Sequence, residues 1–144
     1  MRKFLPVDNY KIIKPVRKTA KSAGYDICCP YDIFIAPFTF TVVPTNVKAV
    51  VNDDEFVMIV PRSSLYKKHR LIMVNSFGVI DADYAGNPAN DGNIGAILYN
   101  NSSEPQIIEK DEPFVQAIIV KYLITDDDEA AGERVGGFGS TDKK

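Results

Sequence analysis

Phe38-Thr39-Phe40-Thr41-Val42 alternates apolar side chains with threonines, which is the period of a strand with one buried face. Short runs rich in Val, Ile, Phe and Tyr recur through the chain, and Pro, Gly, Asn and Asp separate them. These runs lie near residues 11–16, 25–29, 33–43, 47–51, 56–60, 71–74, 78–80, 94–99, 106–109 and 114–124. No stretch carries a sustained helical apolar period. The pattern therefore predicts an all-β fold, a distorted jelly roll or double-sheet β-barrel, with one short helix.

The short helix is expected directly after Pro61, at Arg62-Ser63-Ser64-Leu65-Tyr66, where the serines can cap its first turn. At 144 residues the chain is long enough for one domain with a sizeable core. Residues 126–144 are acidic and then glycine-rich, with almost no aliphatic side chains. We therefore predict a β core over residues 1–125 and a flexible C-terminal arm over residues 126–144.

Composition excludes several classes of partner. The formal net charge is −2, with 45% hydrophobic and 25% charged residues, so the chain as a whole does not attract nucleic acid or an anionic membrane. No segment approaches the roughly 20 apolar residues that span a bilayer, and the first residues lack a signal-peptide core, so we expect a cytoplasmic protein. Cys28 and Cys29 are adjacent and are expected to be reduced structural thiols. His69 stands among basic residues, which favours a solvated loop.

Residues 75–86, Asn-Ser-Phe-Gly-Val-Ile-Asp-Ala-Asp-Tyr-Ala-Gly, are the clearest candidate site. Asp81 follows three apolar residues, so it is expected at the end of a strand, where a carboxylate held by the sheet can orient a water molecule. The alternative is a turn in which Asp81 and Asp83 are simply solvated. Pro61-Arg62-Ser63-Ser64 offers an arginine fork and two hydroxyls to a polyphosphate, and its alternative is a capped surface helix. Gly136-Gly137-Phe138-Gly139, taken alone, is typical of a flexible linker.

These features occur together, in this order, in a β-rich chain of this size. On them the chain resembles the homotrimeric dUTP pyrophosphatases (dUTPases), a family with five ordered motifs. The motifs correspond to residues 23–27, 61–65, 75–86, 110–117 and 134–141, and the third and fifth are the most specific. The Arg-Ser-Ser sequence and the altered loop after the third motif are similar to bacterial and phage-encoded members.

The resemblance implies hydrolysis of dUTP to dUMP and pyrophosphate, which keeps uracil out of DNA and supplies dUMP. Asp81 corresponds to the carboxylate that orients and deprotonates the water attacking the α-phosphorus. Asn75 corresponds to the side chain that binds the uracil edge, and the hairpin backbone from Gly78 to Tyr84, including Ile80, supplies the remaining base contacts. Tyr84 corresponds to the ring packed against the deoxyribose, where a 2′-hydroxyl would clash.

The resemblance also implies how the triphosphate is held. The corresponding phosphate-binding residues are Arg62, Ser63, Ser64 and Gln116, with Arg134, Ser140 and Thr141 from the arm. Phe138 and Gly139 belong to the same arm motif, in which Phe138 would stack on the uracil as the arm closes. Mg²⁺ would be held mainly by the phosphates and waters, with Asp26 as a ligand through water. The sites would form at subunit boundaries of a homotrimer.

The chain departs from the family pattern at several places. Pro113 stands where the fourth motif usually carries an arginine, and Arg134 lies one residue closer to Phe138 than usual. Residues 87–92 look like an insertion of six residues and are expected to protrude, where a protein regulator could bind. One alternative is therefore a nucleotide-gated regulatory or partner-binding protein on the same fold. A dCTP deaminase is less expected, because Ile97 stands where those enzymes need a glutamate that transfers protons.

Overall fold

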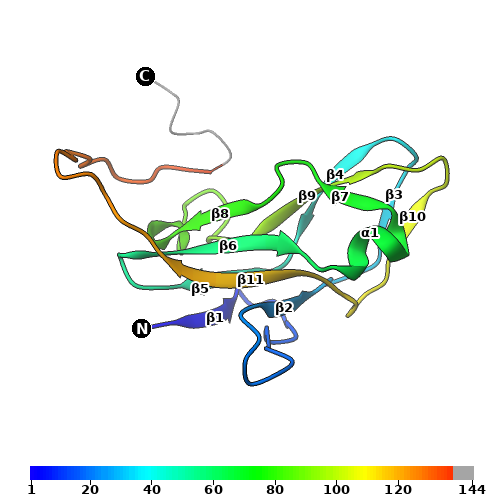
Figure 1. The fold of residues 1–144 in the computed structure, drawn as a ribbon, viewed down its shortest axis with the longest axis horizontal. Coiled ribbons are helices and arrows are strands. Elements are labelled where there is room, and N and C mark those ends of the chain that lie inside the picture. Colours follow the sequence, from blue (N-terminus) through cyan, green and yellow to red (C-terminus); the bar gives the residue numbers. More distant parts are fainter. Residues whose placement is uncertain (138–144) are drawn as a thin grey trace.

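The computed structural model describes residues 1–137, and within them the chain consists of short strands and one short α-helix, which confirms the predicted all-β fold (Figure 1). The elements are β1 (Lys3–Pro6), β2 (Tyr25–Cys28), β3 (Ile33–Ile35), β4 (Phe40–Pro44), β5 (Val47–Val50), β6 (Glu55–Pro61), α1 (Ser64–His69), β7 (Leu71–Met73), β8 (Gly78–Asp81), the 3-10 turn η1 (Ala82–Tyr84), β9 (Gly95–Asn100), β10 (Gln106–Ile108) and β11 (Pro113–Lys121). In this part of the chain no helix is long and apolar enough to cross a membrane.

The strand pairings that the structure describes are antiparallel. The largest sheet has the order β2-β11-β6-β8 and a second has the order β4-β9-β7, while β1 pairs with β5 and β3 with β10. Figure 1 shows β6 and β11 running side by side along the molecule, with α1, β3 and β10 at one end. Because β8 is at the edge of the largest sheet, the third motif lies on a strand with one side unpaired by the strands described.

The core follows the two-residue period of the strands. Val57 and Ile59 of β6 are fully buried, as are Ala96 and Leu98 of β9, while the residues between them are only half-buried. Phe114, at the start of β11, is the largest fully buried side chain among the described residues. Full burial of an apolar side chain stabilises the fold by about 1.5–3 kcal/mol, so the alternation determines which face of each strand turns inward.

The stretch that alternates apolar residues with threonines is a strand only from Phe40 onward. Phe38 has a left-handed φ of 54°, and the chain turns there between β3 and β4. In β4 the side chains of Phe40 and Val42 are 66% and 46% exposed, while Val43 is fully buried. The alternation is therefore confirmed over β4, but its apolar members lie on the outer face of the single chain.

Two local predictions were wrong, a strand at residues 11–16 and a serine cap at the start of α1. Residues 11–16 form no strand, and their one β contact is an isolated bridge between Val16 and Asp26. The helix lies where it was predicted and begins at Ser64, but the side chain of Ser63 makes no capping hydrogen bond. Its backbone is already helical, with φ −57° and ψ −25°, whereas a capping side chain needs an extended backbone.

The prediction that His69 lies in a solvated loop was also wrong. His69 is the last residue of α1 and is buried, and its Nε2 lies 2.7 Å from Oε1 of Glu112. The side chain of Lys68 donates to the same carboxylate oxygen at 2.7 Å. Burial raises the pKa of Glu112, but these hydrogen bonds outweigh it and leave that pKa below its ordinary value. These contacts hold α1 against Glu112 of the fourth motif. The basic residues beside His69 in sequence did not reveal its burial, because successive residues of a helix face different sides.

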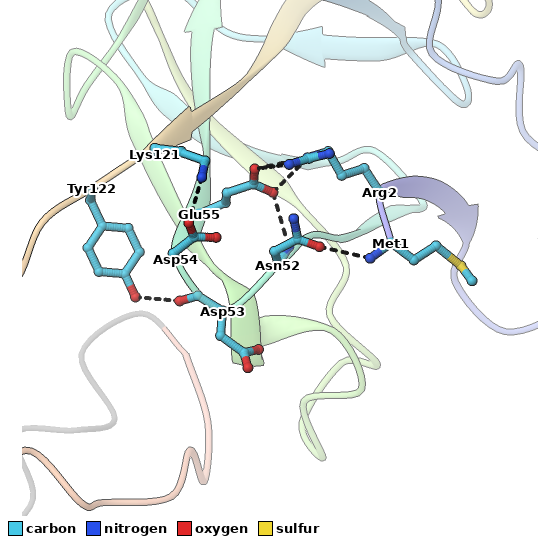
Figure 2. A network of polar contacts seen from close by, with 8 residues as sticks. All are labelled: Met1, Arg2, Asn52, Asp53, Asp54, Glu55, Lys121 and Tyr122. Atoms are coloured by element: carbon cyan, nitrogen blue, oxygen red, sulfur yellow. Dashed lines mark hydrogen bonds and ion pairs between the residues drawn. The ribbon is translucent and has the colours of Figure 1, made fainter.

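A polar network holds the N-terminus and the end of β11 together at the turn between β5 and β6 (Figure 2). Arg2 donates from Nε to both carboxylate oxygens of the buried Glu55, each at 2.9 Å. Just past β11, the hydroxyl of Tyr122 donates to the carbonyl of Asp53 at 2.9 Å. Beyond Tyr122 the chain forms neither helix nor strand up to residue 137, and Figure 1 shows it turning back past β8. The boundary of a flexible arm at residue 126 stays a prediction.

Candidate active site

The third motif and the arm line one cavity of about 170 Å³. Its lining residues are Asn75, Gly78, Val79, Ile80, Asp81, Tyr84, Gly95, Arg134 and Gly137. Asp81 is the last residue of β8, as predicted, and Tyr84 ends the 3-10 turn that follows. The structure thus brings together the side chains expected to contact the base, the sugar and the attacking water. Phe138, Gly139, Ser140 and Thr141 lie outside the described residues.

Arg134 makes the closest polar contacts of this cavity. Its Nη2 donates to Oδ2 of Asp81 and its Nε donates to Oδ1 of Asp83 at 2.6 Å. The guanidinium also lies over the Tyr84 ring, 5.5 Å from the ring centre. The hydrogen bond that Arg134 donates to Asp83 raises the pKa of Arg134, so the guanidinium stays charged between the two carboxylates. Arg134 was expected at the phosphates, whereas here it neutralises the candidate catalytic aspartate.

Asp83 is a residue whose contact the sequence did not indicate. It had no assigned role, and in the structure its carboxylate binds the arm through Arg134, from 51 residues further along the chain. No local pattern signals a pairing between residues so far apart in sequence.

Tyr84 is also held by residues 87–93, hereafter the 87–93 loop. The amide nitrogen of Asn90 donates to the Tyr84 hydroxyl at 2.9 Å. Asn87 is only 2% exposed, and Gly92 is buried close to the backbone of Tyr84. The loop is thus anchored at Asn87 and Gly92, while Pro88 and Ala89 are exposed. Binding of a protein regulator at this loop stays a prediction.

A second group gathers residues of the first, second and fourth motifs. Oδ1 of Asp26 lies 3.1 Å from Nε of Arg62, and Asp26 stands directly opposite Gln116 in the sheet. Oδ2 of Asp26 is buried and has no hydrogen-bond partner within residues 1–137. The side chain of Gln116 lies over Gly24, where a Cβ would come 2.0 Å from Oε1 of Gln116. Only glycine leaves room for this carboxamide.

The second group also bears on the missing arginine of the fourth motif. Pro113 begins β11, and Nη1 of Arg62 lies 3.4 Å from its carbonyl oxygen. The guanidinium of Arg62 is therefore the cation that the structure places beside Pro113. Ser63 and Ser64 follow with exposed side chains at the start of α1.

The two groups lie far apart in one chain. Asp81 pairs with Phe56 at the beginning of β6, whereas Arg62 follows the last residue of that strand. An extended chain rises about 3.3 Å per residue, so the two ends of β6 are about 20 Å apart. A single chain therefore does not bring the candidate catalytic aspartate to the candidate phosphate-binding residues.

Comparison with known proteins identifies the family of this chain. The dUTPase family model matches residues 10–142. The deoxyuridine 5′-triphosphate nucleotidohydrolase of Lactococcus lactis is 40% identical over 146 aligned positions, covering 98% of this chain and 97% of that protein. Among solved structures, the dUTPase of Streptococcus mutans superposes with a TM-score of 0.84 at 35% identity, covering 86% of this chain and 98% of that one. The chain belongs to the dUTPase family.

A more distant structure shows the same fold. The dUTPase of phage φ11 of Staphylococcus aureus superposes with a TM-score of 0.74 at 18% identity, covering 92% of this chain and 97% of that one. That phage protein is described as coordinating a structural Mg(II) ion.

Proposed function

We propose that Asp81 orients and deprotonates the water that attacks the α-phosphorus of dUTP. The chain is a dUTP diphosphatase, which hydrolyses dUTP to dUMP and pyrophosphate and so keeps uracil out of DNA. The observation that carries the role of Asp81 is its place at the end of β8, in one cavity with Asn75 and Tyr84. A carboxylate fixed by a sheet can accept a proton from a positioned water, and in-line attack on phosphorus depends mainly on such positioning.

The base and sugar are proposed to bind along the outer side of β8. In an antiparallel edge strand the backbone groups of every second residue face away from the neighbouring strand. Gly78 and Ile80 are two residues apart, so both can present their backbone groups to a uracil that Asn75 binds from the side. Tyr84 would pack against the deoxyribose and exclude a 2′-hydroxyl.

The phosphates are proposed to bind the second group, through Arg62, Ser63, Ser64 and Gln116. Arg134, Ser140 and Thr141 of an arm would complete the cage, and Phe138 and Gly139 would cover the uracil. For this, Arg134 must exchange its two carboxylates for phosphate oxygens. The exchange is chemically reasonable because both partners are anionic and Arg134 keeps its charge.

Mg²⁺ is proposed as the cofactor, and Asp26 is the residue that would hold it through water. The buried oxygen of Asp26 that lacks a partner within residues 1–137 fits such a role, since a buried carboxylate oxygen needs a donor or a cation. The ion would be held mainly by the substrate phosphates and by waters. When bound, the ion would neutralise phosphate charge.

A homotrimer with shared sites is proposed, acting in the cytoplasm where nucleotide substrates are free. The separation of about 20 Å between Asp81 and Arg62 along β6 supports it, because only a neighbouring chain could bring these groups together. A second support is the outer face of β4, β9 and β7. Phe40, Tyr99 and Ile72 are paired across these strands, and the exposed Phe40 and Ile72 show that this face is open in one chain. An open apolar face is typical of a subunit interface.

The catalytic role is tested by measuring pyrophosphate release from dUTP, dTTP, dCTP and UTP. We expect turnover of dUTP alone, and a fall in kcat of about 10²- to 10⁴-fold for Asp81→Asn. The matched control Asp8→Asn changes an exposed aspartate in the N-terminal turn and should be as active as wild type. An Asp81→Asn variant with wild-type kcat would overturn the mechanism.

Shared sites are tested by complementation. Asp81→Asn and Arg62→Ala are each expected to be inactive. If the two residues of one site come from different chains, unfolding and refolding them together at equal amounts restores about a quarter of the sites. No recovery in a mixture that refolds to trimers would show that one chain supplies both residues.

A further inference from the structure

The 87–93 loop is anchored to the core at several points. Oδ2 of Asp91 pairs with Nζ of Lys48 at 2.6 Å and accepts the backbone N–H of Asp8 at 3.1 Å. Asn93 accepts the backbone N–H of Asn46 at 3.0 Å through its side-chain oxygen. These contacts join the loop to β5 and to the N-terminal turn. A loop held in this way has a defined position and can hold another side chain.

Within the loop, the carboxamide of Asn90 has little freedom. Its nitrogen donates to the Tyr84 hydroxyl at 2.9 Å and to the carbonyl of Asn93 at 3.3 Å, and its oxygen accepts the N–H of Gly92 at 3.1 Å. Gly92 has a left-handed φ of 76°, and a Cβ there would come 2.6 Å from the carbonyl oxygen of Tyr84. The loop therefore holds both the backbone and the hydroxyl end of Tyr84.

The arm also packs against Tyr84, next to Asn87 of the loop. A Cβ on Gly137 would come 2.9 Å from Cε2 of Tyr84 and 3.1 Å from its hydroxyl oxygen. The guanidinium of Arg134 lies over the ring face. Tyr84, only 7% exposed, is thus enclosed by the 87–93 loop and residues 134–137 together.

We propose that Asn90 is a positioning residue that sets the preference of this enzyme for dUTP over UTP, by fixing Tyr84 against the sugar. The inference rests on the proposed role of Tyr84 in excluding the 2′-hydroxyl. A ring excludes a hydroxyl only if it cannot move aside, and the Asn90 amide is the contact that holds its far end. Without that contact the ring can tilt, and the room gained admits the 2′-hydroxyl of UTP.

The experiment compares kcat/KM for dUTP and for UTP in Asn90→Ala, Tyr84→Phe, the double variant and Tyr84→Ala. Removing one hydrogen bond should lower the dUTP-to-UTP ratio by about three- to tenfold in Asn90→Ala and by a similar factor in Tyr84→Phe. The double variant should fall no further, because both changes remove the same bond. In Asn90→Ala the kcat for dUTP should stay within about twofold of wild type, which a general loss of structure would not allow. Asn101→Ala, a change at an exposed asparagine outside the loop, should leave the ratio unchanged.

The possible results distinguish a failure of the role inferred for Asn90 from a failure of the role proposed for Tyr84. If Tyr84→Ala lowers the ratio but Asn90→Ala does not, Asn90 has no positioning role and the inference fails alone. If Asn90→Ala lowers the ratio as much in the Tyr84→Phe background as in wild type, Asn90 acts by another route and the inference also fails. If Tyr84→Ala leaves the ratio unchanged, the sugar-excluding role of Tyr84 fails and the inference fails with it. Should Asn90→Ala not fold, Tyr84→Phe decides, because it removes one oxygen atom and an unchanged ratio refutes the inference.

Discussion

Gly24→Ala is expected to lower activity while leaving the fold nearly as stable as wild type. The new Cβ would come 2.0 Å from Oε1 and 2.8 Å from Cδ of Gln116, so the carboxamide must move by more than an ångström. The atoms that clash belong to the end of a flexible side chain, so the displacement costs the fold little. It does, however, take Gln116 out of hydrogen-bonding range of a phosphate. A lost hydrogen bond to a charged group weakens binding by about 1.5–3 kcal/mol, which lowers kcat/KM for dUTP by about 10- to 150-fold.

The assay is pyrophosphate release at a range of dUTP concentrations, together with thermal unfolding. Gly132→Ala is the matched control, because a Cβ on Gly132 meets no atom within 4 Å, and it should keep wild-type activity. In a Gln116→Ala background Oε1 and Cδ are gone and only Cβ remains, 3.2 Å from the new methyl group, so Gly24→Ala should cost little further activity. The reasoning is refuted if Gly24→Ala alone is fully active, or if it lowers activity equally with and without the Gln116 side chain.

Two further predictions concern stability. Phe114→Ala should lower the free energy of unfolding by about 3–5 kcal/mol, because Phe114 is fully buried at the start of β11, and urea unfolding at fixed protein concentration measures it. The hydrogen bond from Arg2 holds the pKa of Glu55 below its ordinary value of 4.5, so this contact stabilises the fold above pH 4.5 and is lost as pH falls through the lowered pKa. Arg2→Met should therefore be less stable than wild type near neutral pH, and the gap should close in unfolding experiments below pH 4.5; a gap that persists in acid would contradict this.

Much of the fold could be predicted because the strand signal is local. Alternation over a few residues determines the two faces of a strand, and the runs near residues 47–51, 56–60 and 106–109 are strands in the structure. Strand β1 was missed, because Lys3–Pro6 is short, carries a proline and is a strand only through its pairing with β5. The position of Asp81 at a strand end could be predicted for the same local reason.

The sequence by itself determined most of the strands, the site of the helix and the motif residues, since each of these depends on neighbours within a few positions along the chain. Tertiary structure alone decided how these residues are used. In the folded chain Arg134 donates hydrogen bonds to Asp81 and Asp83, and Asn90 donates one to Tyr84. Arg62 lies at the other end of β6 from Asp81. Such contacts join residues that lie far apart along the chain, and a local pattern shows which face of a strand is buried but not which distant segment lies beside it.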